Sequence, residues 1–63
     1  MEEGIQTNRI LVVDDDSDVR AVFEEMLELH DFEVVTAASG EEALKHVHAM
    51  QFDAIVSDVS MTV

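Results

Sequence analysis

The sequence predicts an α/β fold in which three short strands alternate with two helices. The expected strands are Arg9–Val13, Glu33–Ala37 and Ala54–Ser57, each apolar over much of its length. Between them, apolar residues recur with the period of an amphipathic helix. Alternation of this kind with short connections produces right-handed crossovers and a parallel sheet. We expect the strand order 2-1-3, with one helix on each face of the sheet.

The first strand is expected to be buried on both faces. Its core at residues 10–13 (ILVV) is continuously apolar and largely β-branched. A strand with one face in water would instead alternate apolar and polar residues, so this run favours the interior of a parallel sheet. The strand ends abruptly, because residues 14–16 are all aspartate.

The first helix is expected directly after these aspartates. Asp16 or Ser17 can supply the N-cap oxygen, and Asp18 in the first turn suits the helix dipole. One side of the helix carries residues spaced i, i+3, i+4, i+7, i+8 and i+11, which predicts a stripe that packs on the sheet. The stripe consists of Val19, Val22, Phe23, Met26, Leu27 and His30.

The second helix opens with a capping box, because Ser39 is followed three residues later by Glu42. Asp53 precedes the third strand and is expected to shape the turn into it. The buried stripe of the second helix is expected to consist of Ala43, Leu44, Val47 and Met50.

Composition narrows the class of protein. The 63 residues include 15 Asp and Glu but only 3 Lys and Arg, a formal net charge of −12. This charge repels nucleic acid and anionic membrane surfaces, so neither is expected as a partner. No segment has the ~18 apolar residues of a membrane span, the N-terminus does not resemble a signal peptide, and cysteine is absent. We therefore expect a cytoplasmic location.

Three carboxylates are expected to converge at one edge of the sheet. Asp14 and Asp15 follow the first strand, and Asp58 follows the third. Ligand sites in open parallel sheets form at the carboxyl ends of the strands, where neighbouring connections diverge to opposite faces. Clustered carboxylates favour a divalent cation, and Mg²⁺ suits one or two carboxylates with water and a phosphate. A bound cation makes one carboxylate oxygen usable as a nucleophile toward a phosphoryl group.

Two other interpretations of the acidic residues remain open. Residues 14–18 can form a solvated loop that only caps the following helix. They can also belong to an EF-hand calcium loop, although Val19 stands where that loop requires Gly and a strand precedes it. Positions 1, 3, 5 and 12 of such a loop would be Asp14, Asp16, Asp18 and Glu25.

Three segments resemble the receiver domain of two-component response regulators. Residues 10–16 (ILVVDDD) are similar to the opening strand and acidic pair of that family. Residues 39–44 (SGEEAL) resemble the start of its second helix, and residues 52–61 (FDAIVSDVSM) its third strand and phospho-acceptor loop. The resemblance implies half of a flavodoxin-like doubly wound fold. Residues 1–63 would then be a truncated receiver domain with its first three strands and two helices.

The resemblance also implies roles for individual residues. Asp58 would be the phospho-acceptor, taking a phosphoryl group from the phosphohistidine of a histidine kinase or phosphotransfer protein. Asp15 would ligate Mg²⁺ directly, and Asp14 would help to hold it through water. Asp58 and the backbone carbonyl of Ser60 would complete the protein ligands. Phosphorylation would then change a surface that contacts an output domain or partner.

The sequence departs from the family pattern in two respects. Thr62 follows Met61, where family members usually have Pro. The family fold has five strands, and the hydroxyl residue ending strand four, the Lys ending strand five and the aromatic switch residue have no counterpart here. That hydroxyl and that Lys grip the phosphoryl group, so we expect weak Mg²⁺ binding and impaired phosphotransfer in the chain alone.

A three-stranded sheet leaves the third strand at an open edge that carries Ile55 and Val56. Such an edge readily pairs with another chain. The alternative to signalling is therefore a structural half-domain without signalling activity, a homodimer whose third strands pair antiparallel about a two-fold axis. Ser57 has no nearby base in the sequence, so a hydrolase is not supported and we do not expect an enzyme.

Overall fold

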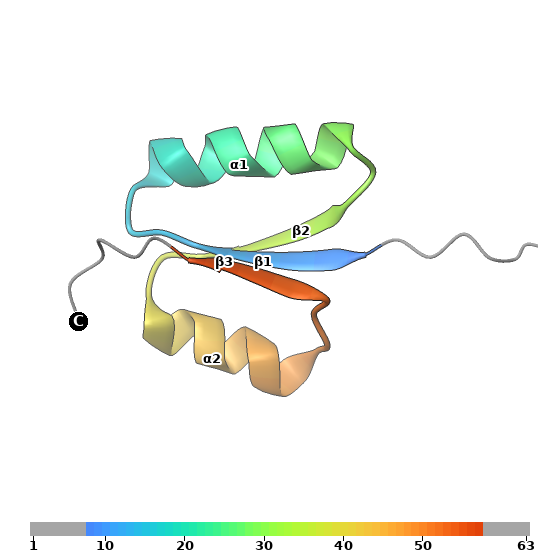
Figure 1. Ribbon diagram of the computed structural model, residues 1–63. Helices are drawn as coiled ribbons and strands as arrows, with labels where there is room; N and C mark the ends of the chain where they lie inside the picture. Colours follow the sequence, from blue (N-terminus) through green and yellow to red (C-terminus); the bar gives the residue numbers. More distant parts are fainter. Residues whose placement is uncertain (1–7, 58–63) are drawn as a thin grey trace, which may run out of the picture.

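A computed structural model describes residues 8–57, and it shows a central sheet with one helix on each face (Figure 1). β1 lies in the middle and pairs in parallel with both neighbours, giving the order β2-β1-β3. The predicted fold class and strand order are therefore confirmed. The elements are β1 (Arg9–Val13), α1 (Ser17–Leu29), β2 (Glu33–Ala37), α2 (Gly40–Ala49) and β3 (Ala54–Ser57).

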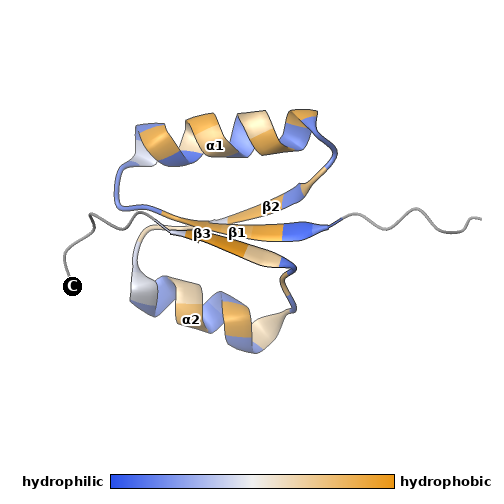
Figure 2. Ribbon diagram, viewed as in Figure 1, coloured by the Kyte–Doolittle hydropathy of each residue, from blue (hydrophilic) through white to orange (hydrophobic). Residues whose placement is uncertain are grey.

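β1 supplies most of the hydrophobic core. Its residues from Ile10 to Val13 are all buried, and Leu11 and Val12 are fully enclosed. Successive side chains of a strand point to opposite faces. Leu11 and Val13 cluster with Ala37 on one face, where residues of α2 and the following turn pack against them. The apolar colour of the strands lies between the two helices (Figure 2), so the predicted burial of β1 on both faces is confirmed.

The N-terminus of α1 is set by Asp16 rather than Ser17. The Asp16 carboxylate accepts hydrogen bonds from the backbone N–H groups of Asp18 at 2.9 Å and Val19 at 3.4 Å. At the other end, Asp31 has a φ of 68°, in the left-handed region. The N–H groups of Asp31 and Phe32 then donate to carbonyls of the last turn of α1, which is the Schellman pattern of helix termination.

The N-terminus of α2 is held by side chains on both sides of the first turn. Ser39 Oγ accepts a hydrogen bond from the backbone N–H of Glu42 at 3.1 Å. The Glu42 carboxylate in turn accepts from the N–H of Ala38 at 2.8 Å, one residue before the N-cap. Both partners of the predicted capping box therefore act at this end of the helix.

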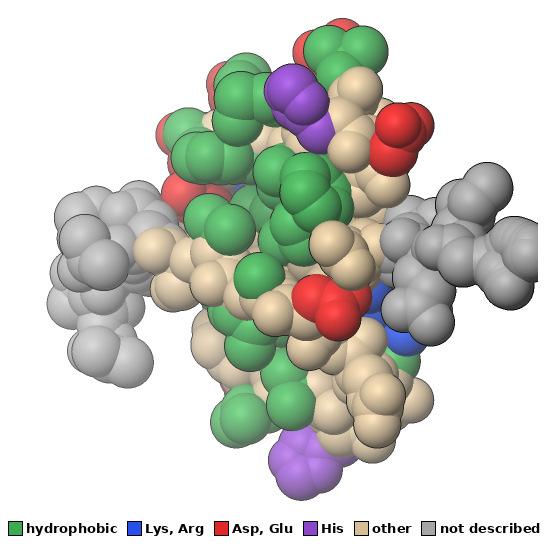
Figure 3. All heavy atoms as spheres, turned by 45° about the vertical axis from the view of Figure 1, so that its right-hand side comes forward, with side chains coloured by type: hydrophobic (Ala, Val, Ile, Leu, Met, Phe, Trp, Pro, Cys, Tyr) green, Lys and Arg blue, Asp and Glu red, His purple; other side chains and the backbone are tan. Residues whose placement is uncertain are grey.

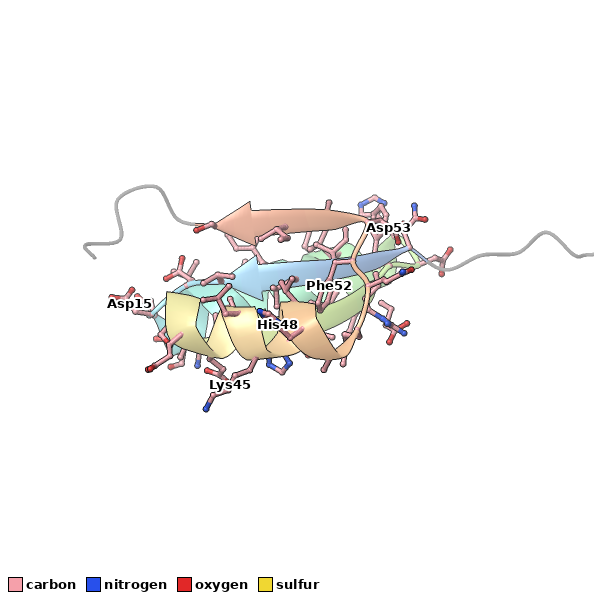
Figure 4. All side chains as sticks on the ribbon, turned by 90° about the horizontal axis from the view of Figure 1, so that it is seen from below. Asp15, Lys45, His48, Phe52 and Asp53 are labelled. Carbon is pink, nitrogen blue, oxygen red and sulfur yellow. The ribbon has the colours of Figure 1, made fainter. Side chains whose placement is uncertain are left out.

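The apolar stripes of the helices are less buried than predicted. Neither helix contains a buried residue. Val22 on α1 and Leu44 on α2 are 62% and 60% exposed, which corrects the expectation that both face the core. Both helices pack on β1 and β2 but not closely on β3. Seen from below, α2 covers β1 and β2 while β3 lies to one side (Figure 4). The apolar stripes stay partly exposed because a sheet of three strands is too narrow to cover their full width.

β3 is the open edge that the sequence predicts. Ile55 is 55% exposed. A hollow of about 510 Å³ lies between α2 and β3, with Val47 and Ile55 among its lining residues. A second hollow of about 370 Å³ lies between α1 and β3, lined in part by Phe23 and Val56. Hydrophobic side chains gather between the two helices on this side of the molecule (Figure 3).

Arg9 ties the amino ends of the three strands together. Its backbone N–H donates to the Asp53 carboxylate at 2.7 Å, and the Asp53 N–H donates back to the Arg9 carbonyl at 2.8 Å. The Arg9 Nε also lies 3.2 Å from a carboxylate oxygen of Glu33, at the start of β2. Asp53 therefore shapes the turn into β3, as predicted.

Replacement of Ser39 by Ala should remove the N-cap of α2 and lower the free energy of unfolding by about 1 kcal/mol. Urea denaturation followed by far-UV circular dichroism measures this change. Ser17→Ala is the matched control, because Ser17 begins α1 while Asp16 provides the cap. Equal losses in the two variants would contradict the assignment of Ser39 as a cap.

Candidate functional site

The carboxyl end of β1 leads directly into the acidic residues. The Asp14 N–H donates to the Ala37 carbonyl at 3.1 Å, which extends the pairing of β1 with β2 by one residue. Asp14 is only 5% exposed, whereas Asp15 and Asp16 are exposed. Figure 4 places Asp15 at the carboxyl end of the sheet and Asp53 at the other end.

Hydrogen bonds within the loop give the aspartates different tasks. The Asp14 carboxylate accepts from the backbone N–H of Asp16 at 2.9 Å, and the Asp16 carboxylate caps α1. The Arg20 guanidinium, one turn into α1, donates to the Asp14 carbonyl at 2.7 Å. Asp14 and Asp16 thus shape the loop, and Asp15 is the exposed carboxylate between them.

The end of β3 lies beside this loop. Val13 and Ser57 are partners in the parallel register of β1 and β3. Asp14 and Asp15 therefore stand at the predicted edge of the sheet. Asp58 and Ser60, the other predicted metal ligands, lie outside the described residues, and their convergence with Asp14 and Asp15 stays a prediction.

The donor set at this edge fits Mg²⁺. Asp14 and Asp15 offer carboxylate oxygens, one buried and one exposed, and Mg²⁺ prefers one or two carboxylates with several waters. Within residues 8–57, no three His, Cys, Asp or Glu side chains are placed to hold a metal ion together.

The structure removes the calcium-loop alternative. An EF-hand loop over residues 14–25 would have to remain largely non-helical, but α1 begins at Ser17. Glu25 lies on the helix and is exposed, so it cannot return to the aspartates as a ligand. The capping interpretation is correct for Asp16, and it is compatible with a metal role for Asp14 and Asp15.

Arg20 is the residue of this site that sequence reasoning missed. It is one of only three Lys and Arg residues in the chain, and it follows the aspartates by a single helical turn. The available signal was that one of the few positively charged residues stands so close to an acidic cluster. The contact itself depends on how α1 leaves the sheet, which the sequence pattern does not report.

A parallel sheet with one helix on each face places this chain among doubly wound α/β domains, a class that includes CheY. The chemotaxis protein CheY4 of Vibrio cholerae superposes with a TM-score of 0.87 at 40% sequence identity, over 92% of this chain and 48% of CheY4. Residues 10–63 match the response regulator receiver domain. The chain belongs to the response regulator receiver family.

The relatives are regulators and a sensor kinase. Over 63 residues the chain is 51% identical to the transcriptional regulatory protein PrrA of Mycobacterium tuberculosis, covering all of this chain and 27% of PrrA. It is 36% identical over 61 residues to the autoinducer sensor kinase/phosphatase CqsS of Vibrio cholerae, covering 97% of this chain and 9% of CqsS. The chain therefore spans only a small part of the curated relatives it matches.

Family membership corrects one expectation. The expectation that the chain is not an enzyme is wrong, because receiver domains catalyse their own phosphorylation, although they are not classical enzymes and the relatives are named regulators. Neither helix in the described part of the chain is long and apolar enough to cross a membrane.

Replacement of Asp15 by Asn should stabilise the metal-free chain, because it removes one exposed charge from a crowded acidic loop. We expect a gain of about 0.5 kcal/mol in the free energy of unfolding at low ionic strength, and salt should reduce it. Urea denaturation at low and high NaCl measures the gain. Glu25→Gln removes an equal charge from the exposed part of α1, and an equal gain there would contradict local repulsion at Asp15.

Proposed function

We propose that residues 1–63 are the phospho-accepting half of a cytoplasmic receiver domain. In this proposal Asp58 takes a phosphoryl group from the phosphohistidine of a histidine kinase or phosphotransfer protein, with Mg²⁺ bound beside it. The similarity to CqsS, a sensor kinase/phosphatase, supports a partner of the kinase kind.

One observation carries the proposal, namely the register of β1 with β3. Val13 pairs with Ser57, and the next residues in the sequence are Asp14 and Asp58. Parallel strands in this register bring their following residues to the same edge of the sheet. This supports a shared site for the acidic pair and the acceptor.

The proposed transfer forms one bond and breaks another. A carboxylate oxygen of Asp58 attacks the phosphorus, the P–N bond to the imidazole breaks, and its electron pair returns to the ring nitrogen. Mg²⁺, when bound, neutralises the charge on the phosphoryl oxygens. Asp15 and Asp58 would hold it directly, with the Ser60 carbonyl. Asp14 would act through water, which suits a buried carboxylate already bonded to the Asp16 N–H.

The chain alone should accept phosphate slowly. The family residues that grip the phosphoryl group, a hydroxyl and a Lys, have no counterpart in these 63 residues. Acetyl phosphate with Mg²⁺ should nevertheless add the mass of one phosphoryl group, and peptide mapping should place it on Asp58. Asp15→Asn should lower the rate at least about tenfold, because a direct metal ligand matters at least as much as an outer one.

Asp58→Asn and Asp53→Asn are the paired variants for this test. Asp53 sits at the amino edge of the sheet, away from the acidic loop, so its loss should leave the rate of labelling unchanged. Labelling that persists in Asp58→Asn, or that ignores the removal of Mg²⁺ by chelation, would overturn the proposal.

A second function, self-association through β3, has its own support. Ile55 is 55% exposed on an edge strand that neither helix covers. An uncovered strand edge with apolar side chains templates pairing with another chain. We propose an antiparallel β3–β3 contact about a two-fold axis, which would give a six-stranded sheet in a homodimer.

Replacement of Ile55 by Lys should dissociate this homodimer, because it places a charge in the proposed contact. Light scattering over a tenfold concentration range should give the mass of a dimer for the wild type and the mass of a monomer for Ile55→Lys. Leu29→Lys adds the same charge at the end of α1, where the native side chain is 79% exposed, and should leave the mass unchanged. A folded Ile55→Lys chain of unchanged dimer mass would exclude β3 as the interface.

A further inference from the structure

We propose that Arg20 is a positioning residue of the acidic site, which holds the β1–α1 loop in the shape that binds Mg²⁺. The inference rests on the Mg²⁺ site of the proposed function and names a residue beyond its ligand set. Arg20 acts through the backbone of Asp14, not on the metal itself.

The first step of the argument is the contact between Arg20 and Asp14. The Arg20 guanidinium donates a hydrogen bond of 2.7 Å to the Asp14 carbonyl, in a partly buried setting. The Arg20 backbone is fixed by the first hydrogen bond of α1, since its N–H donates to the Asp16 carbonyl at 3.0 Å. The side chain therefore reaches from a rigid helix back to the end of β1.

The second step is the position of the carbonyl that Arg20 holds. That carbonyl belongs to the peptide joining Asp14 to Asp15, so its orientation sets the direction in which Asp15 leaves the backbone. Asp14 is also fixed through its N–H, which donates to the Ala37 carbonyl, and through its carboxylate, which accepts from the Asp16 N–H. Arg20 provides the third restraint on a residue that precedes the proposed direct ligand.

The third step separates the hydrogen bond from the charge. The chain has three Lys and Arg residues, and one of them, Arg9, lies at the opposite end of β1. The positive charge of Arg20 eases repulsion among the aspartates, but it also repels an arriving Mg²⁺. If charge were its whole effect, removal of Arg20 would tighten Mg²⁺ binding. If positioning dominates, as we propose, removal weakens it.

Two substitutions distinguish these effects. Arg20→Met removes the charge and the donor, and Arg20→Lys keeps the charge and an N–H donor of nearly the same reach. With Mg²⁺ alone as the probe, we expect Arg20→Met to weaken binding about fivefold, the worth of one hydrogen bond. Arg20→Lys should stay within about twofold of the wild type, because it keeps the hydrogen bond. Backbone amide shifts of residues 14–16 in NMR spectra report binding, and Lys45→Met is the control for loss of charge on α2.

A second readout needs no metal. Hydrogen exchange of the Asp16 amide should be faster in Arg20→Met than in the wild type, while the amides of Leu11 and Val12 should be unaffected. Arg20→Lys should retain the wild-type rate at Asp16. Should Arg20→Met fail to fold, Arg20→Gln, whose shorter side chain loses both the charge and the contact with the Asp14 carbonyl, should show the changes expected for Arg20→Met in both measurements.

The outcomes separate this inference from the proposed function. A wild-type chain that does not bind Mg²⁺ refutes the metal site, and exchange at Asp16 still decides whether Arg20 orders the loop. A chain that binds Mg²⁺ equally well with and without Arg20 overturns the role of Arg20 alone. Tighter Mg²⁺ binding in Arg20→Met also overturns it, because charge would then be the whole effect.

Discussion

The structure depends on the parallel pairing of β1 with a strand on each side. β1 is the only strand among residues 8–57 with two partners, and its four apolar residues are buried. Its position between β2 and β3 forces the two crossovers to opposite faces of the sheet. Because β1 and β3 are parallel, their carboxyl ends lie at one edge, so the strand that buries these four side chains also places the acidic loop.

Stability and function share the same few residues after β1. Asp16 caps α1, and its N–H binds the buried Asp14 carboxylate. Close packing of negative charge lowers stability, whereas capping and the helix dipole make acidic side chains favourable at the N-terminus of a helix. Two of the three aspartates therefore serve the start of α1. Asp15 makes neither of these contacts, which leaves its carboxylate available for the ligand role proposed above.

Much of the fold could be predicted from the sequence, but the burial of the helices and the full site could not. The ILVV run predicted the central strand, and Ser39 and Asp53 predicted a helix start and a turn, because each acts through its near neighbours in the fold. Helical periodicity shows which side of a helix is apolar but not how wide a sheet it meets, so Val22 and Leu44 were wrongly expected to be buried. Arg20 was missed because a long side chain finds its acceptor only through tertiary geometry.

The open edge of β3 and the acidic site are parts of one surface. The hollow between α1 and β3 is lined by Phe23 and Val56 at one part and by Asp14 and Ser57 at another. A chain that fills this hollow would remove water beside the Asp14 carboxylate. Electrostatic interactions strengthen where water is excluded, so the repulsion between Asp14 and its neighbours would grow and a cation would be held more tightly. If Mg²⁺ binds as proposed, coverage of β3 and binding of the cation should therefore favour each other, because Ser57 lines this hollow and the proposed ligand Asp58 follows it in the sequence.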